Sequence, residues 1–173
     1  MQQLRRKVRL SSDIPQTHMV MLENETELEE IYADDLRQVS DFSVLKKLTT
    51  PIYISLCNNV LLRDLEFLGH KPNLKKLYLN NTGILNLIGI EACTALEELS
   101  LQHCLHLKDL SGISHVKSLK KIDLSYCTGI KNLDHLLTLP KLREINLRGC
   151  YQITEQEELY RHFPDYTERI RFN

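Results

Sequence analysis

The chain has 173 residues and carries 22 Lys plus Arg against 23 Asp plus Glu, so its formal net charge is −1. A chain so close to neutral has no overall attraction to nucleic acid or acidic lipid, and no apolar run reaches the roughly 18 residues that suggest a membrane span. The five cysteines are odd in number and form no C-x-x-C pair. This argues against a disulfide framework and indicates a reducing compartment inside the cell, most simply the cytoplasm.

The first ten residues, MQQLRRKVRL, are basic. No apolar stretch follows them, so they are not a secretory signal, although an Arg-rich start without an acid before Asp13 also fits a mitochondrial presequence. Within them, Val8 to Leu10 fits the strand of a weak first coil. We therefore expect residues 1–27 to form either an N-terminal cap or a degenerate first repeat.

The rest of the chain repeats with a period of about 23 residues, and such a period has to be recognised before any single motif is interpreted. One frame is shared by LKKLYLNNTGILNL from 74, LEELSLQHCLHLKDL from 96, LKKIDLSYCTGIKNL from 119 and LREINLRGCYQIT from 142. That frame is L-x-x-L-x-L-x-x-C-x-x-L-x-x-L. The unit from 74 has Thr82 in the cysteine position and is one residue shorter.

The frame resembles the leucine-rich repeat superfamily, and specifically its cysteine-containing style, in which cysteine replaces the usual asparagine. The matching positions of two units are Leu96, Leu99, Leu101, Cys104, Leu107 and Leu110, then Leu119, Ile122, Leu124, Cys127, Ile130 and Leu133. The resemblance implies an α/β fold: a right-handed solenoid with a short parallel β-sheet on the concave face and short helical or 3-10 turns on the convex face. Each L-x-L should be a short strand, and each unit leaves an apolar face that only its neighbour can bury.

Two earlier segments extend the frame toward the N-terminus. The sequence PIYISLCNNVLLRDLEFLGHKPN from 51 is in phase, and so is LEEIYADDLRQVSDFSVLKKLTT from 28. The latter has a competing interpretation, because Thr26 and Glu29 match a helix capping box and the apolar residues after them also suit a helical face. Repeats are therefore predicted over residues 28–153, with residues 28–50 as either a degenerate repeat or a capping helix.

The C-terminal segment is predicted to close the solenoid. Thr154 and Glu157 form a second T-x-x-E box, so TEQEELYRHF should be a short helix that ends before Pro164. In the closing RIRFN, Ile170 lies three periods of 23 beyond Leu101 and should belong to a last strand. Residues 154–173 are therefore expected to be a C-terminal cap covering the last apolar face, and the whole chain to be one domain.

The stretch LQHCLHLKDL from 101 raises the question of a metal or thiol site, since Cys104 lies beside His103 and two residues before His106. The repeat favours another interpretation: Cys104, Cys127 and Cys150 are 23 residues apart and should form a buried row that serves backbone groups. A reactive thiol needs a cationic, partly exposed site, and zinc needs ligands that converge from different directions. A linear row provides neither, so no metal or cofactor is predicted.

In the family that the chain resembles, partners usually bind the concave sheet, so residues projecting from the strands are the candidate binding residues. In frame, these outward positions are Tyr53, Ser55, Cys57, Lys76, Tyr78, Asn80, Glu98, Ser100, Gln102, Lys121, Asp123, Ser125, Glu144, Asn146 and Arg148, flanked by Asn81, His103, Tyr126 and Gly149. The row Lys76, Glu98, Lys121, Glu144 alternates in sign and should pair across strands at about 0.2–1 kcal/mol per pair, so these charges alone need only hold the sheet in register. The predicted contact residues are Tyr78, Asn80, Gln102, His103, Asp123, Tyr126, Asn146 and Arg148.

The expected function is a non-enzymatic protein–protein interaction module that serves as a structural or scaffold subunit of a larger assembly. The sequence has no H-E-x-x-H, no G-x-S-x-G and no phosphate-binding glycine loop. One alternative is a substrate-recognition adaptor of a ubiquitin ligase, although no F-box helical bundle is evident before the repeats. Another is an RNA-associated subunit that uses the basic N-terminus. The expected partner is another protein; a membrane is not expected, nucleic acid is disfavoured, and homo-oligomer formation is left open.

Overall fold

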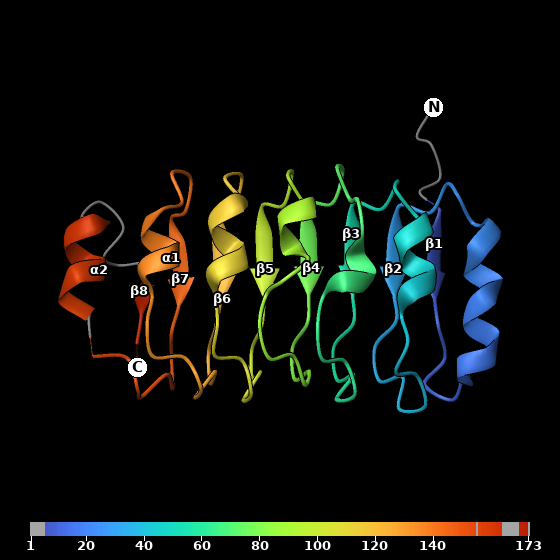
Figure 1. Cartoon of the computed structure of the whole chain (residues 1–173), viewed down its shortest axis with the longest axis horizontal. Helices are drawn as coiled ribbons and strands as arrows, with labels where there is room; N and C mark the ends of the chain where they lie inside the picture. Colours follow the sequence, from blue (N-terminus) through green and yellow to red (C-terminus); the bar gives the residue numbers. More distant parts are fainter. Residues whose placement is uncertain (1–5, 155, 164–169, 173) are drawn as a thin grey trace.

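The computed structural model describes residues 6–154, 156–163 and 170–172, and it shows one elongated coil in which each turn stacks on the next (Figure 1). The described strands form a single sheet in chain order, and each strand pairs in parallel with the next. The strands are β1 (Lys7–Arg9), β2 (Glu30–Tyr32), β3 (Tyr53–Ser55), β4 (Lys76–Tyr78), β5 (Glu98–Ser100), β6 (Lys121–Asp123), β7 (Glu144–Asn146) and β8 (Ile170–Arg171). The predicted parallel sheet of a solenoid is confirmed.

Short helices occupy the opposite, convex side of each coil (Figure 1). They are the 3-10 helices η1 (Gln16–Asn24), η2 (Ser43–Lys47), η3 (Glu66–Leu68), η4 (Ile90–Ala92) and η5 (Ser111–His115), and the α-helices α1 (Asp134–Leu137) and α2 (Gln156–His162). From η2 to α1, an Asp or Asn before the helix accepts a hydrogen bond from the N–H two residues later; these residues are Asp41, Asp64, Asn86, Asp109 and Asn132. The expected short turn per unit is confirmed. No helix in the described part of the chain is long and apolar enough to cross a membrane.

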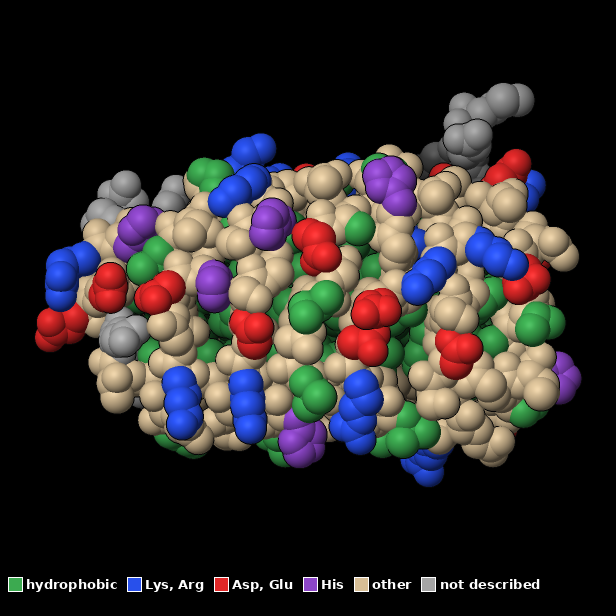
Figure 2. Space-filling model, viewed as in Figure 1, with side chains coloured by type: hydrophobic (Ala, Val, Ile, Leu, Met, Phe, Trp, Pro, Cys, Tyr) green, Lys and Arg blue, Asp and Glu red, His purple; other side chains and the backbone are tan. Residues whose placement is uncertain are grey.

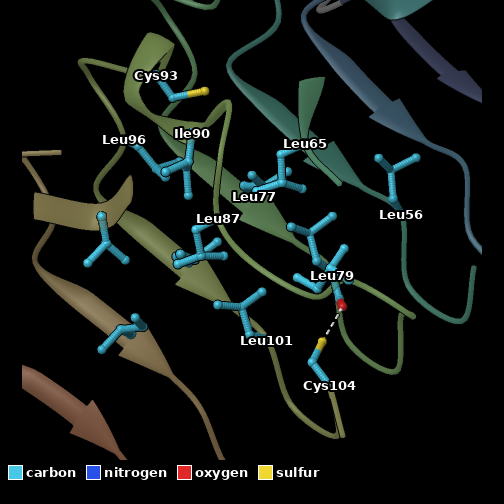
Figure 3. Packing of buried hydrophobic residues seen from close by; sticks show 14 of the residues in the cluster. Leu56, Leu65, Leu77, Leu79, Leu87, Ile90, Cys93, Leu96, Leu101 and Cys104 are labelled. Atoms are coloured by element: carbon cyan, nitrogen blue, oxygen red, sulfur yellow. Dashed lines mark hydrogen bonds between the residues drawn. The ribbon is translucent and has the colours of Figure 1, made fainter. Parts of the chain in front are cut away.

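Leucine side chains from successive coils fill the space between the sheet and the convex helices (Figure 3). The cysteine row lies at the edge of this core, and each thiol donates a hydrogen bond to a carbonyl of the preceding coil. The pairs are Cys104 to Leu79 (3.1 Å), Cys127 to Leu101 (2.9 Å) and Cys150 to Leu124 (3.0 Å). All three cysteines are buried, as predicted. The row therefore satisfies carbonyls where the chain leaves the sheet, which is a structural task.

Asn59 occupies the position of the cysteine row in the coil two turns before Cys104, and its side chain makes more hydrogen bonds than a cysteine does. Its amide nitrogen donates to the carbonyls of Ala33 and Leu56, both at 2.8 Å, and its oxygen accepts from the Leu36 N–H at 2.8 Å. The side chain is 1% exposed. Asn59 thus ties together two coils near the N-terminal end, where sequence similarity between the units is weakest.

Residues 28–50 form a repeat coil. β2 pairs with β1 on one side and with β3 on the other, and η2 follows on the convex side. The helix suggested by the Thr26 capping box is not formed, because Ile31 and Leu36 are buried by the neighbouring coils in the repeat phase. The pairing of β1 with β2 places one more coil before this one. The boundaries of the predicted regions 1–27, 28–153 and 154–173 remain predictions.

At the C-terminal end, the helix and the last strand lie where the sequence placed them. α2 buries Leu159, and Phe163 after it is also buried. β8 is a strand, as predicted, but its register differs from the prediction: Ile170 pairs with Ile145 of β7 and so continues the row of Leu99 and Ile122, two residues from the predicted row of Leu101. The rest of the predicted cap, residues 155, 164–169 and 173, lies outside the described residues.

Lys71 was not anticipated as a core residue. It is fully buried, in the row that holds Leu48, Cys93 and Val116 in other coils. Its ammonium donates to the carbonyl of Leu45 at 2.8 Å and to that of Leu68. Burial lowers the pKa of Lys71 to about 8. A cation therefore joins the ends of η2 and η3, where the other coils have an apolar contact.

Candidate functional site

The concave face carries three outward side chains from each coil, and its charged row is paired across strands. Lys76 Nζ lies 3.2 Å from Glu98, and Lys121 Nζ lies 2.8 Å from Glu144. These pairs join the first residues of adjacent strands, as the alternation of sign predicted. Since both members of each pair are partly exposed, their contribution to stability is small, and their main effect is on strand register.

Asp123 organises the polar centre of this face. One carboxylate oxygen accepts from the amides of Gln102 (3.0 Å) and Asn146 (2.9 Å), and the other accepts from the N–H (2.9 Å) and hydroxyl (2.7 Å) of Ser125. Asn80 is fixed in the same way, since its oxygen accepts from the Gln102 N–H at 3.0 Å. The four predicted residues Asn80, Gln102, Asp123 and Asn146 are therefore brought together. Asp123 is saturated with internal hydrogen bonds, so it serves to orient the amides.

Three serines predicted as outward surface residues are in fact buried. Ser55, Ser100 and Ser125 point to the concave side but are only 4%, 5% and 4% exposed. Each hydroxyl donates a hydrogen bond to a neighbouring polar side chain, namely Asp34, Asn80 and Asp123 respectively. Over the small Ser100 the face is hollowed, and this hollow of about 570 Å³ is lined by Tyr78, Glu98, Gln102, Lys121, Asp123, Asn146 and Arg171 among others.

A row of left-handed residues lies just after the strands, at the rim of the concave face. Asp35, Asn58, Asn81, His103 and Tyr126 have φ between 55° and 62°. Each precedes the core position occupied by Leu36, Asn59, Thr82, Cys104 and Cys127. Asp and Asn tolerate this conformation well, so their recurrence every 23 residues was a signal that the sequence offered. It explains why His103 and Tyr126 point away from the core.

His103 and Tyr126 form a stacked pair within this row. Their ring centroids are 4.5 Å apart and the planes differ by 4°. On its other side the Tyr126 ring lies against Gly149, where a Cβ would be 2.5 Å from Tyr126 Cδ1. The guanidinium of Arg148 lies 5.9 Å from the Tyr126 centroid. The structure thus brings His103, Tyr126 and Arg148 together, but Tyr126 offers a partner its edge and hydroxyl rather than an open face.

The N-terminal half of the concave face holds an aromatic strip, in which Tyr53 and Tyr78 were expected to face outward but Tyr32 was left out of the sequence interpretation. The ring of Tyr53 lies 4.8 Å from that of Tyr32 and 5.4 Å from that of Tyr78. The cations of Lys7 and Arg9 lie 4.3 Å and 4.8 Å from the Tyr32 centroid. Tyr32 lies one period before Ser55 and two periods before Tyr78, and both of these residues face outward. If residues 28–50 are treated as a repeat, the frame therefore predicts that Tyr32 faces outward as well.

Tyr78 connects the strip to the polar centre. Its hydroxyl donates to Glu98 at 2.5 Å, and burial together with this bond raises the pKa of the Tyr78 phenol. Cys57 lies near it on the concave side, half-buried, with its sulfur 3.6 Å from the Ser55 hydroxyl. Burial raises the pKa of the Cys57 thiol. The face is therefore continuous from Tyr32 to Arg148 in half-buried aromatic and amide side chains.

The convex face differs in character. Acidic, basic and histidine side chains are interspersed along it, with scattered apolar ones between them (Figure 2). Leu85 and Ile88 are about half exposed there. Among the described residues, no group of three or more His, Cys, Asp or Glu side chains is placed to hold a metal ion. His106, in the descending loop, is exposed and forms no part of the concave face.

Two family models match the sequence. A model described as the LRR domain of the endo-beta-N-acetylglucosaminidase EndoS matches residues 69–137, and a model described as leucine-rich repeats in two copies matches residues 117–161. A search of the curated proteins finds no significant match.

The chain is also similar to solved structures. A functional domain of InlJ from Listeria monocytogenes, described as including a cysteine ladder, is 22% identical with a TM-score of 0.52, covering 74% of this chain and 31% of that one. Internalin C2 from Listeria monocytogenes is 23% identical with a TM-score of 0.48, covering 74% of this chain and 65% of that one. The LRR ectodomain of the Arabidopsis thaliana receptor kinase GASSHO1/SCHENGEN3 is 14% identical with a TM-score of 0.38, covering 86% and 26%. The chain spans less than two thirds of the length of each, and at this identity the likeness to the InlJ domain shows the fold.

Proposed function

Because this chain is a leucine-rich repeat protein, we propose that it is a non-enzymatic module that binds another protein through the concave face of its sheet. Proteins of this fold are typically protein–protein interaction modules. The observation that carries the proposal is the preorganisation of the concave side chains. Asp123 fixes the amides of Gln102 and Asn146, and the Tyr126 ring is held between His103 and Gly149.

Preorganisation lowers the conformational entropy that a surface loses when it binds. Each fixed amide still has hydrogen-bonding capacity left, because an amide offers two donors and two acceptor positions and Gln102 and Asn146 each use one N–H on Asp123. Tyrosine and arginine, which are enriched among residues that dominate binding energy, lie at Tyr78, Tyr126 and Arg148. The face therefore combines fixed polar groups with aromatic edges, which suits a protein partner.

We further propose that the chain acts as a scaffold subunit inside the cell. The supporting observations are the five free cysteines, four of them buried in the core, and the absence of a catalytic signature in the sequence. Burial raises the pKa of the Cys93 and Cys150 thiols, so these thiols are unreactive, and unpaired cysteines are usual in a reducing compartment.

The test is recovery of partners from native cell extract on the immobilised protein, with mass spectrometry of what is bound. The concave variant combines Gln102→Ala and Arg148→Ala, which remove groups without opening the core. The matched control combines Gln152→Ala and Lys108→Ala, both exposed and away from the sheet. We expect parent and control to recover the same partner and the concave variant to lose most of it, since removing an anchor often costs about 2 kcal/mol or more. Equal recovery by the concave variant at an equal melting temperature would place the interface elsewhere.

A further inference from the structure

The two ends of the solenoid differ in how their last apolar residues are covered. At the C-terminal end, Ile170 of β8 is 5% exposed. Helix α2, which contains the buried Leu159 and is followed by the buried Phe163, lies beside β8 (Figure 1). At the N-terminal end, Val8 continues the same row of middle strand residues but is only partly buried. On η1 at this end, Val20 is 61% exposed and Met21 is 55% exposed. The described residues thus leave the N-terminal end less covered than the C-terminal one.

Strand β1 is an edge strand, and half of its backbone groups point away from the sheet. The Leu10 N–H donates to the Tyr32 carbonyl at 2.8 Å, and the Arg6 carbonyl accepts from Glu30 at 3.2 Å. These even-numbered residues face β2. Since the peptide groups of alternate residues in a strand point to opposite edges, those of Lys7 and Arg9 face outward, where no described strand pairs with them. Such an edge is a ready template for another strand.

The positive charges of Lys7 and Arg9 beside this edge favour an added strand that carries acidic side chains. Lys7 already lies 3.8 Å from Glu30 on its inner side. Across the sheet, a lysine at this first strand position has an acidic neighbour in the next strand, as Lys76 has Glu98 and Lys121 has Glu144. Arg9, at the third position, adds a second cation. A strand outside β1 would therefore be favoured with acidic residues opposite Lys7 and Arg9 and an apolar residue opposite Val8.

We propose that the outer edge of β1 is a second docking site, which takes an extended acidic–apolar–acidic segment of another protein as an added strand. The added apolar side chain would cover Val8 and extend the buried row. A second copy of this chain fits poorly, because β1 and β8 would bring Lys7, Arg9 or Arg171 against like charges. The site adjoins Tyr32 at the N-terminal end of the concave face, but it does not use Gln102, Tyr126 or Arg148, so the two proposals can be tested separately.

The test uses short labelled peptides and fluorescence anisotropy. The probe is Glu-Val-Glu-Val-Glu; Lys-Val-Lys-Val-Lys reverses its charge, and Glu-Pro-Glu-Pro-Glu keeps its charge but lacks the N–H groups that a strand needs. The protein variant is Lys7→Glu with Arg9→Glu. The matched control is Lys108→Glu with Lys131→Glu, which makes the same change of net charge at exposed positions away from the edge. Thermal melts of all variants check folding.

We expect the parent and the control variant to bind the Glu-Val peptide, and the Lys7→Glu, Arg9→Glu variant to bind it at least about tenfold more weakly. The same variant should gain affinity for the Lys-Val peptide, a gain that an unfolded protein would not show specifically. The proposal is overturned if the parent does not bind the Glu-Val peptide. Lys7 and Arg9 would then serve only to prevent other strands from pairing with β1. Equal binding of the Glu-Pro peptide would overturn it too, since attraction would then need no strand. Sedimentation of the parent as a dimer through this edge would name a second copy as the occupant and reject the acidic segment.

Discussion

Replacing Lys71 by methionine should change how the stability of the protein depends on pH. Lys71 is fully buried, its ammonium binds the carbonyls of Leu45 and Leu68, and its pKa is lowered from 10.5 to about 8. A lowered pKa means that the folded protein releases this proton at a lower pH than the unfolded chain does. Below pH 8 both states hold the proton, and above about 10.5 neither does. Between these values the unfolded chain binds more protons, so the stability contribution of Lys71 rises with pH.

The size of the effect follows from the difference between the two pKa values. Each unit of difference between the two pKa values changes the free energy of unfolding by about 1.4 kcal/mol, so Lys71 contributes about 3 kcal/mol between pH 8 and 10.5. Near pH 7, removing the buried cation relieves its desolvation, whereas the two carbonyls lose a donor at a cost of about 1–3 kcal/mol each. These effects oppose each other, so the free energy of unfolding of Lys71→Met should lie within about 2 kcal/mol of that of the parent near neutral pH.

Urea unfolding of the parent and of Lys71→Met at pH 7, 8, 9 and 10 in reducing buffer measures this directly. Cys93, whose thiol interacts with Lys71, is replaced by alanine in both proteins, and the remaining cysteine and tyrosine titrations then cancel in the difference. Lys75→Met removes an exposed lysine of the same coil and serves as the control. The parent should gain stability relative to Lys71→Met as pH rises above 8. A difference that stays flat or falls with pH would refute the reasoning that burial disfavours the charged form at this position.

Three further predictions concern the core and the ends. Iodoacetamide should modify Cys57 alone in the native protein, and a second thiol that reacts before unfolding would contradict the buried row. Gly149→Ala should lower the free energy of unfolding by about 1–3 kcal/mol, because the added methyl group would lie 2.5 Å from Tyr126 Cδ1 and the backbone φ at this position is +74°. Urea unfolding and the NMR chemical shifts of the Tyr126 ring measure this. If neither the urea midpoint nor the ring shifts change, Tyr126 does not pack against Gly149. Deleting residues 154–173 should lower the melting temperature or cause aggregation by baring the last apolar face, and a truncated monomer that melts like the parent would show that α2 and β8 do not act as a cap.

The architecture could be predicted because the core of a solenoid repeats in sequence as it does in space. A last strand was predicted around Ile170 from its distance to Leu101, and β8 lies there, but Ile170 takes the register of Leu99, because the segment that joins β7 to β8 does not keep the 23-residue period. Cys104 and Cys127 were placed in the core because a row with one residue per coil faces inward throughout. The same rule extended to residues 28–50 would have put Tyr32 on the concave face beside Tyr53.

Features that depend on one coil alone could not be predicted from the frame. Lys71 stands in an apolar row, and only the structure shows its ammonium reaching the carbonyls of Leu45 and Leu68. Ser100 was placed on the concave side correctly, but its burial depends on the size of its neighbours and on its bond to Asn80. The stack of His103 on Tyr126 depends on backbone φ values that a pattern of leucines does not encode.

The concave face can be tested directly by hydroxyl-radical footprinting of the free protein and of its complex with the partner recovered from extract. Tyr53, Tyr78 and Tyr126 report on the concave side and its rim, and Tyr151, which is 83% exposed and lies outside the sheet, is the internal control. If the concave face binds the partner, oxidation of the first three should fall in the complex while that of Tyr151 stays unchanged. Protection of Tyr151 with unchanged oxidation of the three concave tyrosines would contradict the proposed binding face.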